Sequence, residues 1–108
     1  MIFKVEVTSY FKKQTKQLLK KYPSLKTELD ELVSSLEIQP EQGTAIGNHC
    51  YKIRLAISSK GKGKSSGARI ITHIQIVKNN VFLLSIYDKS AQSDISNKEL
   101  KKLLQLIP

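Results

Sequence analysis

The chain has 108 residues, 40% of them apolar, which suits one domain (residues 1–108) with a single core and argues against general disorder. Its 18 lysines and arginines face only 9 aspartates and glutamates, and the net charge of +9 favours a polyanion or an acidic protein as partner. Charged residues near the start of the sequence argue against a signal peptide, and no apolar run is long enough to cross a membrane. A lone cysteine excludes an internal disulfide. We therefore expect a cytoplasmic protein without a membrane segment.

The first part of the chain predicts one strand followed by two helices. Residues 2–7 alternate imperfectly between apolar and charged side chains, as in a short strand. A helix should start after Thr8 or Ser9 and stop before Pro23, which cannot continue it. Ser24 can cap a second helix, and the short turn between the two favours an antiparallel hairpin. The apolar side of this second helix consists of Leu25, Leu29, Leu32, Val33 and Leu36.

The second part of the chain predicts a loop, three strands and a closing helix. The glycine-containing residues 39–48 read as the loop. From Cys50 onward the apolar period is two, and the expected strands are 50–58, 69–76 and 81–87. Residues 79–80 are both asparagine, which tolerates positive φ angles, so they suit a hairpin turn. Residues 96–99 form a Ser-x-x-Glu capping box, which predicts the start of the closing helix. We therefore expect an α+β fold, β-α-α-β-β-β-α, with the N-terminal strand and helical hairpin packed on a curved antiparallel sheet.

Basic residues concentrate in the middle of the chain. From Gln42 to Tyr87 there is no Asp or Glu, and the seven basic residues are Lys52, Arg54, Lys60, Lys62, Lys64, Arg69 and Lys78. Strand alternation places Lys52 and Arg54 opposite an apolar face, and Arg69 can join them from a paired strand. Loop lysines often serve only solubility, whereas rigid cations on strands suit phosphate recognition. We therefore predict contact with an anionic polymer at the strand cations, assisted by the loop residues Lys60, Lys62 and Lys64.

Other polar side chains could take part in chemistry. At the end of the last strand an aromatic ring, a carboxylate and an ammonium follow one another, at Tyr87, Asp88 and Lys89. The ring could stack a base while Asp88 or Lys89 handles a proton or a phosphate, or the three could form a capped strand end with an ion pair. His73 could line the same surface, although a lone strand histidine is more often structural. Cys50 reads as a buried thiol, and no metal-ligand spacing is present, so we expect no metal and no cofactor.

Several segments, in this order, resemble one family. CYKIRL at residues 50–55, a basic loop, Gly-Ala-Arg at 67–69 and FLLSIYDKS at 82–90 resemble the RelE/ParE superfamily of bacterial toxins. The chain looks most similar to the HigB-type toxins of type II toxin–antitoxin modules. The resemblance implies two helices on a curved antiparallel sheet and a metal-independent, ribosome-dependent mRNA endonuclease that acts through attack of a ribose 2′-hydroxyl. It also implies binding to the ribosome and mRNA, and inhibition by a cognate antitoxin, expected to be of the helix-turn-helix type.

The resemblance also assigns roles to individual residues. Lys52 and Arg54 match the basic pair of a family strand, and Arg69 matches its Gly-x-Arg arginine, the candidate for phosphate stabilisation. The catalytic residues implied are Lys52, Arg69, Tyr87, Asp88 and Lys89, and the RNA or ribosome contacts are Arg54, Lys60, Lys62, Lys64 and His73. Ile95 and Lys89 stand where the RelE branch has a tyrosine and an arginine, so the general base stays open between Lys52 and Asp88. The alternatives are a ParE-like gyrase inhibitor, which would not be an enzyme, or an inactive relative.

Overall fold

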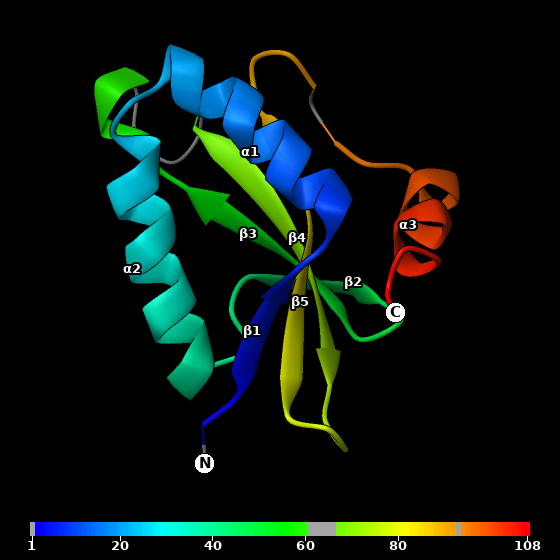
Figure 1. Cartoon of the computed structure of the whole chain (residues 1–108). Coiled ribbons are helices and arrows are strands. Elements are labelled where there is room, and N and C mark those ends of the chain that lie inside the picture. Colours follow the sequence, from blue (N-terminus) through cyan, green and yellow to red (C-terminus); the bar gives the residue numbers. More distant parts are fainter. Residues whose placement is uncertain (1, 61–66, 93) are drawn as a thin grey trace.

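The computed structural model describes residues 2–60, 67–92 and 94–108 (Figure 1). The helices are α1 (Ser9–Lys21), α2 (Leu25–Ile38) and α3 (Asn97–Leu104), with a short 3-10 turn, η1 (Ser58–Lys60). The strands are β1 (Lys4–Val7), β2 (Thr44–Gly47), β3 (Cys50–Leu55), β4 (Ala68–Gln75) and β5 (Asn80–Asp88). They form one five-stranded sheet in the order β1-β5-β4-β3-β2. The α+β fold predicted from the sequence is confirmed, with the helical hairpin and the closing helix in the expected places.

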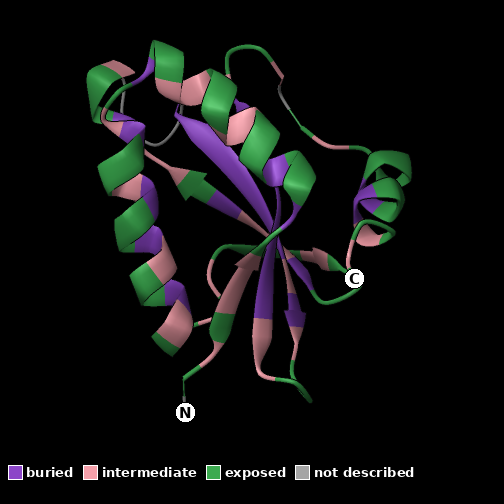
Figure 2. Cartoon of the chain, in the orientation of Figure 1, coloured by how far each residue is buried: buried purple, intermediate pink, exposed green. Residues whose placement is uncertain are grey.

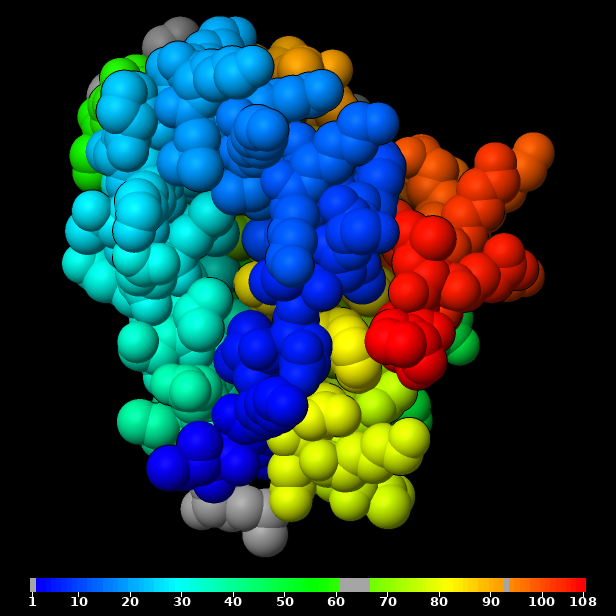
Figure 3. Space-filling view, viewed as in Figure 1, coloured from blue at the N-terminus to red at the C-terminus, as the bar shows by residue number. Residues whose placement is uncertain are grey.

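Helices cover both faces of the sheet (Figure 1). On one face, α1 and α2 pack their apolar side chains against strand residues that include Ile53, Ile70, Leu83 and Ile86. On the other face, α3 packs against a second cluster that includes Cys50, Ile71, Phe82, Leu84 and Tyr87. Strand β5, between β1 and β4, is buried throughout residues 81–88 (Figure 2). The space-filling view shows α1 beside α2 on one side and beside α3 on the other (Figure 3).

Side-chain caps begin two of the three helices. The Thr8 hydroxyl accepts a hydrogen bond from the Phe11 N–H at 3.1 Å, which starts α1. The capping box before α3 is confirmed, because Ser96 Oγ accepts from the Glu99 N–H at 3.1 Å and the Glu99 carboxylate accepts from the Ser96 N–H at 3.4 Å. Ser24 occupies the N-cap position of α2, as predicted, but makes no side-chain capping bond. Each helix in the described ranges is too short or too polar to span a bilayer.

Two details of the sheet differ from the sequence-based expectation. Residues 39–48 are not all loop, because Thr44–Gly47 forms β2, antiparallel to β3. The glycines that suggested a loop instead turn the chain into and out of this strand, with φ of 90° at Gly43 and 95° at Gly47. The sheet is also not wholly antiparallel: β1 runs parallel to its neighbour β5, and the helical hairpin belongs to the long connection that follows β1.

Candidate functional site

Four polar side chains lie together on the α3 face of the sheet. The register places Arg54 opposite Arg69 across β3 and β4, and Arg69 opposite Tyr87 across β4 and β5. Opposed residues of antiparallel strands share a face, with Cβ atoms about 5 Å apart. Lys52 lies two residues before Arg54 and therefore projects to the same face. We call Lys52, Arg54, Arg69 and Tyr87 the strand site.

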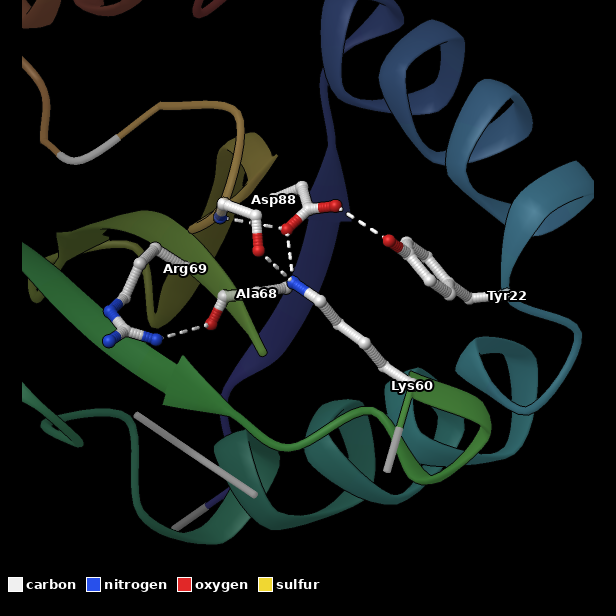
Figure 4. Close-up of polar contacts among 6 residues, drawn as sticks. Tyr22, Lys60, Ala68, Arg69 and Asp88 are labelled. Atoms are coloured by element: carbon white, nitrogen blue, oxygen red, sulfur yellow. Dashed lines mark hydrogen bonds and ion pairs between the residues drawn. The ribbon is translucent and has the colours of Figure 1, made fainter. Parts of the chain in front are cut away.

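Arg69 is the most deeply placed cation of the strand site. Its residue is only 4% exposed, and its Nη1 donates a hydrogen bond to the Ala68 carbonyl at 3.2 Å. In Figure 4 its guanidinium points away from the carboxylate of Asp88. Burial on a central strand fixes the direction of this permanent charge. An anion that reached it would meet a fixed cation in a setting where water screens charge less than it does at the surface.

Tyr87 supplies a buried hydroxyl to the strand site. The residue is 5% exposed, and within the described parts of the chain its hydroxyl oxygen has no hydrogen-bond partner. Burial raises the pKa of Tyr87, the charge of Asp94 raises it further, and the charge of Arg69 opposes this. The phenol is therefore protonated at neutral pH. An unsatisfied buried hydroxyl costs about 1–3 kcal/mol, so a ligand that accepted its hydrogen bond would recover free energy.

Asp94 brings one carboxylate to the strand site. Its Oδ1 lies 3.1 Å from Lys52 Nζ and accepts a hydrogen bond from the Ile95 N–H at 2.8 Å. The bond from Ile95 and the contact with Lys52 lower the pKa of Asp94, and the charge of Lys89 acts in the same direction. Asp94 is thus an ionised group that partly neutralises the cations. Lys52 and Lys89 are both within its electrostatic reach.

A β-bulge in β5 decides which side chains reach the strand site. Ile71 of β4 pairs with Ser85 of β5, and the next residue, Thr72, pairs with Leu83. Leu84 is therefore one extra residue in β5, without an opposite residue on β4. An extra residue reverses the alternation of side chains beyond it. Tyr87 consequently packs in the α3 cluster, and Asp88 projects to the face covered by α1 and α2.

Asp88 belongs to a buried polar cluster on that opposite face (Figure 4). Its carboxylate lies 2.5 Å from Lys60 Nζ and accepts hydrogen bonds from the Tyr22 hydroxyl at 2.8 Å and the Ser90 N–H at 2.9 Å. The two charged side chains are only 7% and 9% exposed. Burial alone would raise the pKa of Asp88, but the bonds from Lys60, Ser90 and Tyr22 outweigh it and hold the pKa at about 2. This geometry makes Asp88 a structural anion that ties η1, the helical hairpin and the end of β5 together.

The structure therefore separates residues that the sequence placed together. Tyr87 and Asp88 do not share a surface, and Lys60 is engaged by Asp88 on the far face instead of lining the basic surface. Lys89 is half-buried and donates its backbone N–H to the Gly67 carbonyl at 3.0 Å. The remaining loop lysines, Lys62 and Lys64, lie outside the described residues.

The histidine and cysteine form a separate pair at the other end of β3. Cys50 is opposite His73, with Sγ 3.5 Å from Nδ1. Burial lowers the pKa of His73 and raises the pKa of Cys50 to about 11, so the thiol is protonated at neutral pH. His73 lies four positions along β4 from Arg69, about 13 Å at 3.3 Å per residue, so it lies at the Lys52 end of the strand site and far from Arg69. Within residues 2–60, 67–92 and 94–108, no three His, Cys, Asp or Glu side chains could hold a metal ion together.

The fold and the site together define a class: a small α+β protein with strand-borne cations between a helical hairpin and a closing helix. The chain matches the family described as the RelE toxin of the RelE/RelB toxin–antitoxin system over residues 3–107. It therefore belongs to the RelE toxin family, and the resemblance seen in the sequence is confirmed at this level. The assignment to the HigB-type branch stays a prediction.

Solved structures support the fold. The chain is 18% identical to a double arginine-to-alanine mutant of the E. coli toxin RelE in the free state, with a TM-score of 0.63 and 100% of both chains covered. It is 17% identical to the isolated E. coli RelE toxin, with a TM-score of 0.54, 99% of this chain and 100% of that chain covered. At such identities the likeness extends to the fold and not to individual site residues.

Sequence reading passed over three residues that bear on the site. Asp94 could have been considered as an ion-pair partner, because it is an acidic residue just before the capping box of a helix and near several cations. Tyr22, just before Pro23, carried only the general signal that a tyrosine hydroxyl usually needs a partner when it is buried. Gln14 carried no signal at all, since its role depends on a bulge in a strand that is 72 residues away along the chain.

Proposed function

We propose that this RelE-family toxin is a ribosome-dependent mRNA endonuclease that acts in the cytoplasm without a metal ion. The observation that supports this best is the strand site, which gathers two guanidinium groups, an ammonium and a tyrosine hydroxyl on one rigid face. Attack by a ribose 2′-hydroxyl builds negative charge on a single phosphate. Cations fixed in a partly buried site lower the free energy of that state without having to reorganise.

The proposed reaction forms a bond from the 2′-oxygen to phosphorus and breaks the bond to the departing 5′-oxygen, which leaves a 2′,3′-cyclic phosphate and a 5′-hydroxyl. The proton of the 2′-hydroxyl passes to solvent water, and the departing 5′-oxygen takes up a proton from solvent. Arg69 stabilises the charge on the reacting phosphate, and Lys52 and Arg54 hold the adjacent backbone, with Lys89 near them. The Tyr87 hydroxyl donates to a phosphate oxygen or to the departing 5′-oxygen.

No strong protein base is required in this proposal. Asp88 has a pKa of about 2 and its carboxylate already accepts several hydrogen bonds, so it is a poor base and lies on the wrong face. Lys52 is ion-paired with Asp94, so we assign it the role of a cation. Charge stabilisation and alignment of the 2′-oxygen with the 5′-oxygen then supply the rate enhancement.

We also propose two macromolecular contacts. The family is defined by a toxin–antitoxin pair, and a cognate antitoxin, which we expect to be of the helix-turn-helix type, would have to offer acidic groups to cover the strand site. Lys62 and Lys64 are expected to contact ribosomal RNA, with an affinity that falls as salt rises.

Mapping mRNA ends after incubation with translating ribosomes tests the proposal. Arg69→Ala should lower cleavage about a hundredfold or more, because it removes the main stabiliser of charge on the phosphate. Lys78→Ala removes an equal charge from an exposed turn and should cleave like the wild type. Circular dichroism checks that both variants are folded. New mRNA ends at wild-type frequency with folded Arg69→Ala would refute the site, and intact mRNA with a DNA-damage response in cells would favour the gyrase-inhibitor alternative.

A further inference from the structure

The bulge in β5 needs groups outside the sheet to hold it. At a bulge the strand ladder is interrupted, and backbone N–H and C=O groups lose their regular partners. Here α1 supplies replacements on both sides. The hydroxyl of Thr8, the N-cap of α1, lies 3.4 Å from the carbonyl oxygens of Leu83 and of Leu84, the extra residue. Gln14, almost two turns further along α1, lies beside the residues that follow.

Gln14 makes the shorter and better-defined of these contacts. Its Oε1 accepts hydrogen bonds from the Ile86 N–H at 3.0 Å and from the Ser85 hydroxyl at 3.1 Å. A single side-chain oxygen therefore binds both residues between Leu84 and Tyr87. Without the extra residue, Tyr87 would turn toward α1 and α2.

We propose that Gln14 is a positioning residue, which locks the β5 bulge and so holds Tyr87 on the strand site. The catalytic consequence rests on the proposed ribonuclease function, but the structural part does not. Gln14 acts on the strand site through its two partners on β5, the Ser85 hydroxyl and the Ile86 backbone N–H. The fold thereby links the first helix, on one face of the sheet, to the chemistry on the other.

A matched pair of substitutions separates this role from general packing. Gln14→Glu keeps an oxygen acceptor at the same distance along the side chain, and Gln14→Leu keeps the approximate size but removes the acceptor. The side chain lines a cavity of about 360 Å³ between α1 and α3, so it has space to settle in either variant. In Gln14→Leu, hydrogen exchange at the Ile86 amide should be about three- to tenfold faster, as expected for the loss of one hydrogen bond. In Gln14→Glu it should stay near the wild-type rate.

Cleavage measured in a double-mutant cycle tests the link to Tyr87. Gln14→Leu should lower kcat about as much as Tyr87→Phe does, with little change in KM, and the combined variant should be no worse than Tyr87→Phe alone. Gln14→Glu should restore most of the activity. Losses that multiply in the combined variant, or unchanged Ile86 exchange in Gln14→Leu, would overturn the proposal. If the wild type cleaves no RNA, the proposed function fails, but the structural claim can still be tested. The ultraviolet titration of Tyr87 is obtained as the difference between a protein with Tyr87 and the same protein with Tyr87→Phe. A Tyr87 pKa that shifts in Gln14→Leu supports the claim, and an unshifted one refutes it.

Discussion

Replacing Asp88 with asparagine removes one charge from the buried Lys60–Asp88 pair and keeps the size of the side chain. The variant removes the negative charge that lies against the Lys60 ammonium, on a side chain 9% exposed. The Tyr22 hydroxyl can still donate to the amide oxygen of the new side chain, so the loss falls mainly on the charged contact. Because Asp88 lies away from the strand site, we expect the effect to appear in stability and not in the chemistry of the folded protein.

Two lines of reasoning bound the size of the effect. Folding lowers the pKa of Asp88 from 3.8 to about 2, a difference of about 1.8 pKa units, which corresponds to about 2.4 kcal/mol at neutral pH at 1.36 kcal/mol per unit. Breaking a buried ion pair by removing one partner costs about 3–5 kcal/mol, since the remaining charge stays buried. We therefore expect Asp88→Asn to lower the free energy of unfolding by about 2–4 kcal/mol.

The pH dependence follows from the direction of the pKa change. A carboxyl group with a lower pKa in the folded state stabilises the protein above the unfolded pKa, and this stabilisation is lost as pH falls through the folded pKa. For Asp88 the window runs from about pH 4 down to about pH 2, given its shift from 3.8 to about 2. The contribution of this residue should be visible in the wild type across that window and absent in Asp88→Asn.

Urea denaturation at pH 7 and at lower pH measures both effects. Asp30→Asn is the matched control, because the Lys26–Asp30 pair is 77% and 69% exposed and such pairs contribute about 0–1 kcal/mol. The double variant Asp88→Asn, Lys60→Met should recover much of the lost stability, since no unpaired charge remains buried. An Asp88→Asn variant as stable as the control, or one fully folded but unable to cleave mRNA, would refute the structural role of Asp88.

Two further substitutions probe the strand site. Tyr87→Phe should raise the free energy of unfolding by up to about 1 kcal/mol, because it removes a buried hydroxyl without a described partner. The same substitution should lower the rate of mRNA cleavage. Urea denaturation and mRNA-end mapping of one preparation show whether stability rises while cleavage falls. Asp94→Asn should strengthen binding of inorganic phosphate about two- to fivefold, because it removes the carboxylate that now pairs with Lys52. Chemical-shift titration at low salt measures this, and the increase should shrink at high salt; equal or weaker binding would show that Asp94 does not compete with an anion.

Most of the fold could be read from local patterns. The caps at Thr8 and Ser96 depend on neighbouring residues alone, so a sequence displays them directly. The pairing of the strand cations also followed from alternation, since Arg54 and Arg69 lie on regular stretches of β3 and β4. By contrast, β2 was missed because glycine is common both in loops and at the ends of short strands. The parallel partner of β1 is β5, at the far end of the chain, and no local pattern specifies such a contact.

The end of β5 shows why the site was only partly predictable. Alternation assigns Tyr87 and Asp88 to opposite faces, but which residue takes which face depends on whether the strand contains an extra residue. That residue is held by Thr8, the N-cap of α1, and by Gln14 within α1, so the information lies in a tertiary contact. A strand read as regular from Val81 would send Asp88 to the α3 face and Tyr87 into the core under the helical hairpin.

The distribution of acidic residues explains how a basic site stays basic in the folded chain. Only three acids follow Gln42 in the sequence: Asp88, Asp94 and Glu99. Two of them have structural duties, Asp88 in the buried pair with Lys60 and Glu99 in the capping box of α3. Asp94 forms an ion pair with Lys52, and its single negative charge offsets one of the three positive charges of the strand site. The strand site therefore keeps a net positive charge, which a phosphate backbone can neutralise and which an antitoxin that covers it must match with acids of its own.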